Sequence, residues 1–185
     1  RDEQPIKIAL LQRHATDWAL AHDYNPFAAG APTGRRVAIV GAEPAGLSCA
    51  RDLRRLGHAV TVFDERANPG GLNSFGIAEY KMRLPLALAE VKMVTDLGVD
   101  VRTGVRVGTD VSVAQLRKDY DAIFIAIGLG ATRRLNIPGE ELQGVADALS
   151  FIEHLKSNPH SRTRIGRRVV VIGAGNTAID AATQA

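Results

Sequence analysis

Cysteine is almost absent from this chain of 185 residues, which contains only Cys49. A single cysteine excludes an internal disulfide and every metal site built from several cysteines. It also excludes the Cys-x-x-Cys pair on which dithiol oxidoreductases depend. Cys49 falls within a helical pattern, where we expect it to be a small buried side chain.

Long hydrophobic runs, aromatic residues and strong net charge are also missing. No stretch approaches the roughly 20 apolar residues of a membrane span, and we expect no signal peptide. Aromatic residues make up 5% of the chain, and its formal charge is only +3. The arginines stand in small groups without interleaved aromatics, and the five histidines show no ligand spacing. We therefore predict a cytoplasmic protein that holds no metal and binds neither nucleic acid nor a membrane.

The first 34 residues read as an attachment to the rest of the chain. Residues 5–21 repeat apolar side chains at helical spacing, and we expect Trp18 to anchor this helix on the body of the protein. The stretch NPFAAGAPTG (25–34) is rich in Pro, Gly and Ala, as linkers are. Residues 1–34 are predicted to form a helical arm and linker.

From residue 35 onward, short apolar strands alternate with helices. RVAIV (36–40) predicts a strand, 44–57 a helix and 58–65 a second strand, which together make a βαβ unit. Further along we expect a helix over 84–97, a strand pair over 99–108 and a short helix over 111–119. The apolar run 120–130 is typical of a strand buried on both faces of a parallel sheet. The fold class is therefore α/β, with a Rossmann-like domain over 35–132.

The chain then repeats its own opening pattern. After a helix near 148–157, RRVVVIGAGNTAIDAATQA resembles RRVAIVGAEPAGLSCARDL, again a strand, a glycine turn and a helix. This predicts the start of a second Rossmann-like domain over 133–185. Because a Rossmann half needs several more strands, we expect the chain to be a fragment of a longer protein.

Each glycine turn has residues suited to a dinucleotide. The outer glycines of the pattern allow a tight turn and close packing of helix on strand, and the middle one lets a pyrophosphate approach the helix N-terminus. Gly41 and Gly46 hold the outer positions of the first turn, and Asp64, at the end of the next strand, is placed to bind a ribose. The second turn contains Gly173 and Gly175, followed by Asn176 and Thr177, which can cap the helix or contact phosphate. Two turns predict two dinucleotides, FAD at the first and NAD(P)H at the second, with a hydride passing between them.

One residue of the first turn conflicts with this chemistry. Glu43 stands where the pattern requires its middle glycine. An ionised carboxylate about 4–5 Å from a pyrophosphate repels it by roughly 3–4 kcal/mol at an effective dielectric constant near 20. We hypothesise that Glu43 favours an empty site and sharply lowers the affinity for FAD.

The motifs VAIVGAEPAGLSCARDL, VTVFDERANPGGLNSFGIAEYKM, YDAIFIAIG and VVVIGAGNTAIDAA resemble, in order and spacing, the glutamate synthase small subunit family. This family includes the flavoprotein part of dihydropyrimidine dehydrogenase. The resemblance runs from about Ile6 to Ala185. It implies a chain that passes hydride from NAD(P)H to FAD, with electrons leaving through iron–sulfur clusters to a partner subunit or domain. Those clusters would lie in an N-terminal segment or in the partner.

The resemblance also implies roles for individual residues. Those around the FAD pyrophosphate are Gly41, Ala42, Glu43, Pro44, Ala45, Gly46 and Leu47. Those that follow the rest of the cofactor are Asp64 at the ribose with Glu65 and Arg66 beside it, Pro69, Gly70, Gly71 and Leu72 along the ribityl side, and Val107 at the adenine. Lys81, or Arg83 in its place, would pair with phosphate. Ala126–Gly128 would form the crossover, although Ile127 replaces the threonine of the family.

The sequence thus predicts a flavoprotein that takes electrons from NAD(P)H and supplies them to a partner reductase or synthase. No catalytic residue is identified. The alternative is a degenerate dinucleotide fold that serves as an interaction module without flavin, which Glu43 favours. A monooxygenase with a single flavin is a weaker alternative, because the second glycine turn argues against it.

Overall fold

The computed structural model describes residues 5–129, 132–158, 163 and 165–185. Its strands are β1 (Arg36–Val40), β2 (Ala59–Asp64), β3 (Asp100–Thr103) and β4 (Ala122–Ile125). Its helices are α1 (Ile8–Ala21), α2 (Pro44–Arg55), α3 (Leu72–Phe75), α4 (Leu84–Thr95), α5 (Val113–Asp119), α6 (Ala148–Ser157) and α7 (Asn176–Gln184). The predicted strand over 36–40 and the strands and helices around it are confirmed.

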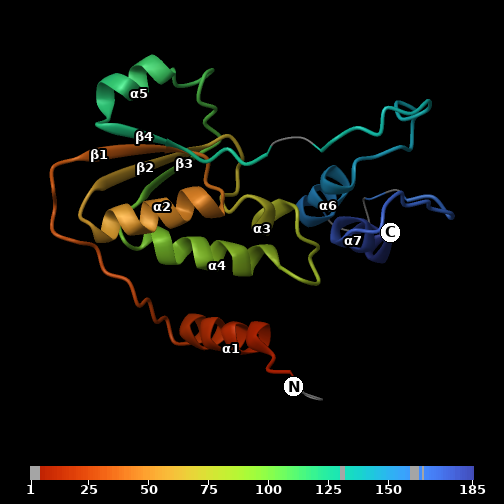
Figure 1. The fold of residues 1–185 in the computed structure, drawn as a ribbon, viewed down its shortest axis with the longest axis horizontal. Coiled ribbons are helices and arrows are strands. Elements are labelled where there is room, and N and C mark those ends of the chain that lie inside the picture. Colours follow the sequence, from red (N-terminus) through yellow and green to blue (C-terminus); the bar gives the residue numbers. More distant parts are fainter. Residues whose placement is uncertain (1–4, 130–131, 159–162, 164) are drawn as a thin grey trace.

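The four strands form one parallel sheet in the order β3-β2-β1-β4. Helix α2 connects β1 to β2, and the chain crosses from β3 through α5 to reach β4 on the other side of β1. Figure 1 shows α2 and α4 together on one side of the sheet and α5 on the other. The predicted α/β class with a parallel, Rossmann-like sheet is therefore confirmed.

Two hydrophobic clusters hold the sheet between its helices. On one face, Ile39 and Val62 pack with Leu47 and Ala50 of α2 and with Val91 of α4. On the other face, a smaller cluster joins the sheet to α5 through side chains that are all buried, namely Ala38, Phe63 and Leu116. Because successive side chains of a strand point to opposite faces, β1 contributes to both clusters.

The prediction that the strand near 120–130 is buried on both faces is wrong. β4 spans only Ala122–Ile125 and pairs with β1 alone among the described strands. Phe124 is 40% exposed and Ile125 is 69% exposed. Continuous apolar sequence indicates two covered faces only when neighbouring elements are present to cover them. Residue 130, the end of the predicted run, lies outside the described residues.

The second copy of the motif does not form its strand. Residues 169–172 are irregular, and Val170 and Ile172 are largely exposed, while helix α7 follows as predicted. A strand requires a hydrogen-bonded neighbour, and none of the described strands lies beside this segment. Of the strand pair expected over 99–108, only β3 forms, and Val107 makes an isolated bridge to Val111.

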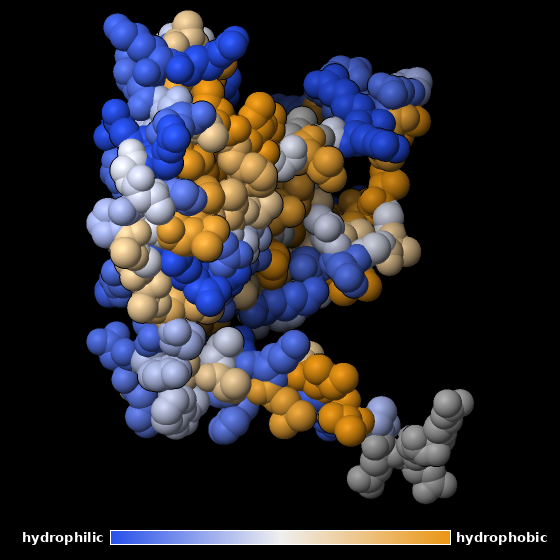
Figure 2. Space-filling view, turned by 60° about the vertical axis from the view of Figure 1, so that its left-hand side comes forward, coloured by the Kyte–Doolittle hydropathy of each residue, from blue (hydrophilic) through white to orange (hydrophobic). Residues whose placement is uncertain are grey.

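The N-terminal arm stands apart from the sheet (Figure 1). Helix α1 begins at Ile8, three residues later than predicted, and none of its residues, all described, is buried. Trp18 does not anchor the arm: it is 51% exposed and stacks on His22 of the same segment. The attachment comes instead from the linker, where Asn25 Nδ2 donates to the Met93 carbonyl at 2.7 Å. Figure 2 shows the exposed hydrophobic side chains at the start of α1, which are Ile6, Ile8, Leu10 and Leu11.

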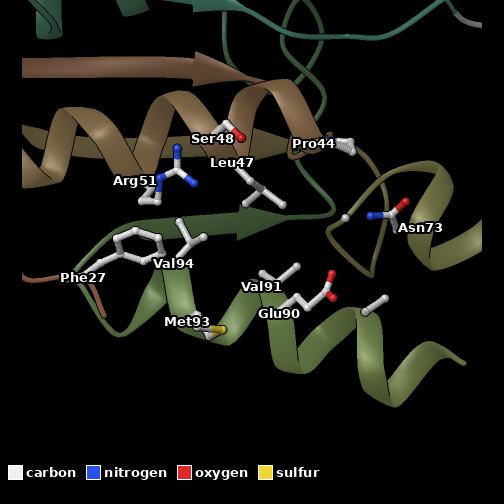
Figure 3. Close-up of a pocket in the computed structure, with 12 residues that line it drawn as sticks. Phe27, Pro44, Leu47, Ser48, Arg51, Asn73, Glu90, Val91, Met93 and Val94 are labelled. Atoms are coloured by element: carbon white, nitrogen blue, oxygen red, sulfur yellow. The ribbon is translucent and has the colours of Figure 1, made fainter. Parts of the chain in front are cut away.

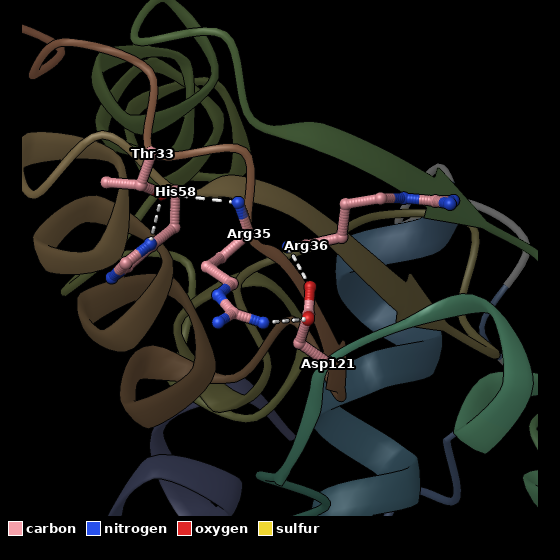
Figure 4. Close-up of polar contacts among 5 residues, drawn as sticks. All are labelled: Thr33, Arg35, Arg36, His58 and Asp121. Atoms are coloured by element: carbon pink, nitrogen blue, oxygen red, sulfur yellow. Dashed lines mark hydrogen bonds and ion pairs between the residues drawn. The ribbon is translucent and has the colours of Figure 1, made fainter.

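A separate set of polar contacts fixes the amino ends of the strands (Figure 4). Asp121 accepts the backbone N–H of Arg36 and the guanidinium of Arg35, both at 2.8 Å. The bond from the Arg36 backbone and that from the Arg35 side chain lower the pKa of Asp121 below its usual value. Nearby, Thr33 Oγ1 lies 2.7 Å from His58 Nδ1. These contacts lie at the end of the sheet opposite to the glycine turn.

The core predicts a simple test of this packing. Ile39 is fully buried between α2 and α4, so Ile39→Ala should lower the free energy of unfolding by about 2–5 kcal/mol. Urea denaturation followed by circular dichroism measures the change. Ile125→Ala, on the neighbouring strand but exposed, is the matched control and should change stability by less than about 0.5 kcal/mol. Equal losses from the two variants would contradict the assigned core.

Candidate functional site

The candidate site lies at the carboxyl ends of β1, β2 and β4. From β1 the chain continues through β2 to β3 on one side of the sheet and then crosses back to β4 on the other side, so the strand order reverses between β1 and β4. In open α/β sheets this switch point leaves a crevice outside the strand ends, and ligands bind there. The turn 41–46 and the segments 70–72 and 126–128 meet at this edge.

The outer glycines of the turn are required by close backbone contacts. Gly41 has φ +104°, and a Cβ there would overlap the Ala126 carbonyl oxygen. A Cβ on Gly46 would overlap the carbonyl oxygen of Gly41. The turn therefore packs tightly against both α2 and the chain that leaves β4, as the glycine pattern predicts.

Asp64 holds the turn against the end of β2. Its carboxylate accepts the backbone N–H of Ala42 at 2.7 Å and that of Arg66 at 2.8 Å. The residue is only 8% exposed. A carboxylate has about four acceptor positions, so these two bonds leave capacity for a ligand hydroxyl.

The segment after β2 closes on the same turn. The Gly70 N–H donates to the Ala42 carbonyl at 2.8 Å. Gly70 and Gly71 both have positive φ, +112° and +57°, which other residues rarely adopt. This conformation brings Gly71 and Leu72 against Glu43, the residue that precedes α2.

The side chain of Glu43 fills the space between these segments. Glu43 is the residue before α2, and its carboxylate accepts a hydrogen bond from the backbone N–H of Leu72. A Cβ on Gly71 would overlap Glu43 Oε2, and one on Gly128 would lie 3.5 Å from Glu43 Cδ. Burial, and then the charge of Asp64, raise the pKa of Glu43, against the lowering effects of the Leu72 bond and of Arg66.

An open polar hollow of about 460 Å³ adjoins the strand ends on the β2–β3 side. Its lining residues come from the chain after β2 and after β3: Glu65, Arg66, Gly104, Arg106, Thr109 and Asp110. Glu65 pairs with Arg106 at 2.7 Å. Val107 follows in sequence, but its side chain packs against the cluster around Phe63.

Another hollow, of about 240 Å³, lies between α2 and α4 (Figure 3). Phe27 of the linker stands at one end, near Arg51, and Pro44 and Asn73 stand toward the other. Glu90 lines it, and burial raises the pKa of this carboxyl. Of the predicted cofactor residues, Pro44, Leu47 and Gly70 line this hollow, while the others lie outside its lining.

The second glycine turn is separated from the first. Gly173 has φ +132°, Gly175 precedes α7, and all four predicted residues here, including Asn176 and Thr177, are exposed. Helix α7 packs on α6, beyond α3 from the sheet (Figure 1). The structure therefore does not bring the two predicted dinucleotide turns together.

Polar side chains connect helix α7, which follows the second glycine turn, to segment 69–82. Asp180 of α7 is 5% exposed and accepts both Tyr80 Oη, at 2.6 Å, and Lys81 Nζ, at 2.5 Å. Burial acts to raise the pKa of Asp180, but the hydrogen bonds from Lys81 and Tyr80 lower it overall. Lys81, predicted to bind phosphate, is thus paired with a carboxylate.

Two further ties come from α6. Lys156 Nζ donates to three carbonyl oxygens of segment 69–82, those of Asn73 (3.0 Å), Ile77 (3.0 Å) and Met82 (2.9 Å). Arg66 pairs with Glu153 and lies 3.6 Å from the ring centre of Phe75. Sequence reasoning missed Asp180 and Lys156. The one available indication was Asp180 itself, a lone charge among the alanines of α7.

Among the described residues there is neither a candidate metal site nor a helix that could span a membrane. In residues 5–129, 132–158, 163 and 165–185, no group of three or more His, Cys, Asp or Glu side chains gathers as a metal site. None of the helices in these ranges is long and apolar enough to cross a membrane.

The known proteins that this chain resembles include subunits of NADPH- and NADP(+)-dependent enzymes. The small chain of NADPH glutamate synthase from Mycobacterium tuberculosis is 36% identical over 191 residues, which cover 97% of this chain and 39% of that protein. The beta subunit of NADP(+)-dependent formate dehydrogenase from Moorella thermoacetica is 38% identical over 155 residues, 83% of this chain and 22% of that one. The chain thus spans less than half the length of these relatives. The resemblance to the glutamate synthase small subunit is confirmed.

The fold comparison agrees. The structure of FprA from Mycobacterium tuberculosis in complex with NADPH matches 80% of this chain and 35% of that one, with a TM-score of 0.67 and 29% identity. A family model described as pyridine nucleotide-disulphide oxidoreductase matches residues 35–185. This chain therefore belongs to the pyridine nucleotide-disulphide oxidoreductase family.

Proposed function

We propose that this chain is part of a flavoprotein that oxidises NAD(P)H, with FAD at the first glycine turn and the nicotinamide dinucleotide at the second. The observation that carries the proposal is the meeting of the first glycine turn with segments 70–72 and 126–128 at the switch point of the parallel sheet. The close backbone contacts of Gly41 and Gly46 and the carboxylate of Asp64 support a pyrophosphate at this turn and a ribose beside it. FAD, when bound, would supply the acceptor of the hydride.

The glycines of the site fit this cofactor, whereas an ionised Glu43 does not. Gly71 and Gly128 leave the backbone uncovered beside Glu43, which supports a ligand that comes close to the backbone. The Asp64 carboxylate would accept the ribose hydroxyls, and the hollow lined by Glu65 and Arg66 would hold the adenine side.

We also propose that the chain works together with a partner subunit, as the relatives imply. The names of these relatives, "small chain" and "subunit beta", support a partner subunit that receives the electrons. Iron–sulfur clusters in another segment or in that partner would carry them, and a cytoplasmic location suits the single cysteine. That cysteine, Cys49, packs beside the core cluster of α2, so the proposed chemistry runs between nicotinamide and flavin without a dithiol pair.

The proposed division of the chain is 1–34 as arm, 35–132 as flavin domain and 133–185 as the beginning of the nicotinamide domain. The exposed helix α1, the confinement of the sheet to residues 36–125 and the packing of α6 on α7 support it.

A flavin-free interaction module is the second candidate function. One observation favours it: the Glu43 carboxylate lies among Leu72, Gly71 and Gly128, where the pyrophosphate would have to pass. In that case the crevice would be closed to phosphate, and the turn would serve only the packing of α2 on the sheet.

Titration with FAD distinguishes the two functions. At pH 8, removal of the repulsive carboxylate by Glu43→Gly should tighten FAD binding about a hundredfold, from roughly 3 kcal/mol of relieved repulsion. Flavin absorbance retained after desalting, together with fluorescence titration, measures it. If neither the parent chain nor Glu43→Gly retains FAD at any concentration tried, the flavin site is rejected and the interaction module is favoured.

The ribose role of Asp64 has its own test, made in the Glu43→Gly background so that binding is measurable. Asp64→Asn removes the charge that strengthens hydrogen bonds to the ribose and should weaken FAD binding by about 10–100-fold. Asp121→Asn is the matched control, because Asp121 also accepts a backbone N–H but at the opposite end of the sheet. It should leave FAD affinity unchanged. Equal effects from both aspartates would indicate general loosening of the sheet.

A further inference from the structure

One carboxylate contacts every backbone segment that borders the proposed pyrophosphate cradle. Glu43 stands at the start of α2, accepts the N–H of Leu72, and lies over Gly71 and Gly128. Gly71 and Gly128 have no side chains, and the atoms nearest to a Cβ built at either of them belong to Glu43. The state of this carboxylate therefore decides whether the cradle accepts an anion.

The surroundings of Glu43 act on its charge in opposite directions. The charged groups of the described residues that face it are Asp64, at the end of β2, and Arg66, just after it. Segment 70–72 contributes a backbone N–H, and segment 126–128 contributes no ionisable side chain. Burial and the negative charge of Asp64 raise the pKa of Glu43 more than the hydrogen bond from Leu72 and the positive charge of Arg66 lower it. The pKa of Glu43 therefore lies above its usual value.

The chemistry of the contact depends on one proton. Pyrophosphate oxygens and an ionised carboxylate are both acceptors, so no hydrogen bond can form between them. A protonated carboxyl group donates an O–H to a phosphate oxygen, and such a bond to a charged acceptor is among the stronger ones in proteins. Its other oxygen remains able to accept the N–H of Leu72.

We propose that Glu43 binds the dinucleotide as a neutral carboxyl group that donates its hydrogen to a pyrophosphate oxygen, so that the first site takes up one proton with its ligand. The proposal rests on the proposed flavin site. The proton comes from solvent, and no covalent bond is made or broken. Glu43 is then a binding residue whose charge state sets the affinity, and the sequence pattern is compatible with FAD in spite of it.

Whether FAD affinity rises or falls with pH follows from the coupling between proton binding at Glu43 and ligand binding. The negative ligand holds the proton on Glu43 to a higher pH than the free protein does. Below the pKa of free Glu43 the affinity is constant. Between the free and the bound pKa values, the dissociation constant rises tenfold for each unit of pH. Raising the pH therefore weakens binding.

Calorimetric titration of the chain with FAD from pH 5 to pH 8.5, in buffers of different ionisation enthalpy, measures both affinity and proton uptake. The unmodified chain should bind at least tenfold more weakly at pH 8 than at pH 5.5 and take up close to one proton per FAD in the window between. Glu43→Gln keeps an acceptor for Leu72 and an N–H donor for phosphate. It should bind with no proton uptake and with little pH dependence.

Glu90→Gln is the matched control. Burial raises the pKa of Glu90 as well, but this carboxyl lies in the hollow between α2 and α4, with Arg13 and Asp17 of α1 near it. Its replacement should leave the pH dependence of FAD binding as it is in the parent chain. Circular dichroism of each variant confirms that it is folded.

Two results overturn the proposal in different ways. If the parent chain binds FAD with the same pH profile as Glu43→Gln, or without proton uptake, Glu43 does not carry the proton and the flavin site survives without it. If Glu43→Gly and Glu43→Gln both fail to bind FAD at every pH, the flavin site itself is absent, and this proposal is rejected with it.

Discussion

The pair of hydrogen bonds that Asp64 accepts from Ala42 and Arg66 is the interaction on which the site depends. They tie the turn after β1 to the end of β2, so that α2 begins at a fixed place above the sheet. Gly41 completes this arrangement, because only a residue without a side chain can pass so close to the Ala126 carbonyl. The helix N-terminus, with its unpaired N–H groups, is thereby directed at the crevice.

Segment 69–82 links this turn to the second half of the chain. One end of the segment is bonded to Ala42 through Gly70, and the other is held by Lys156 of α6 and Asp180 of α7. The ammonium group of Lys156 donates all three of its hydrogens to carbonyls, and the buried Asp180 carboxylate accepts hydrogen bonds from Tyr80 and Lys81. The loop between the two glycine motifs is therefore positioned by contacts from both sides, although the motifs themselves lie apart.

Glu43 shows how a single substitution changes a site without changing the fold. A residue before a helix tolerates an extended backbone and an acidic side chain, and a negative charge near the N-terminus of α2 is favourable to the helix. The same charge opposes a phosphate. Folding and binding thus make different demands on this position, and a proton on the carboxylate removes the repulsion of phosphate while giving up the charge that favours the helix.

The sequence by itself determined the parallel α/β fold, the glycine turn after β1 and the acid that ends β2. These features are local: hydrophobic period, turn glycines and a helix start are set by neighbouring residues. Only the tertiary structure decided that β4 is exposed, that residues 169–172 form no strand, and that Trp18 does not anchor the arm, because burial and strand pairing depend on which distant elements are present to cover a face. It also decided that Lys81 meets Asp180 and that Glu43 meets Leu72, Gly71 and Gly128. Such contacts join residues far apart in the chain, and no spacing in the sequence encodes them.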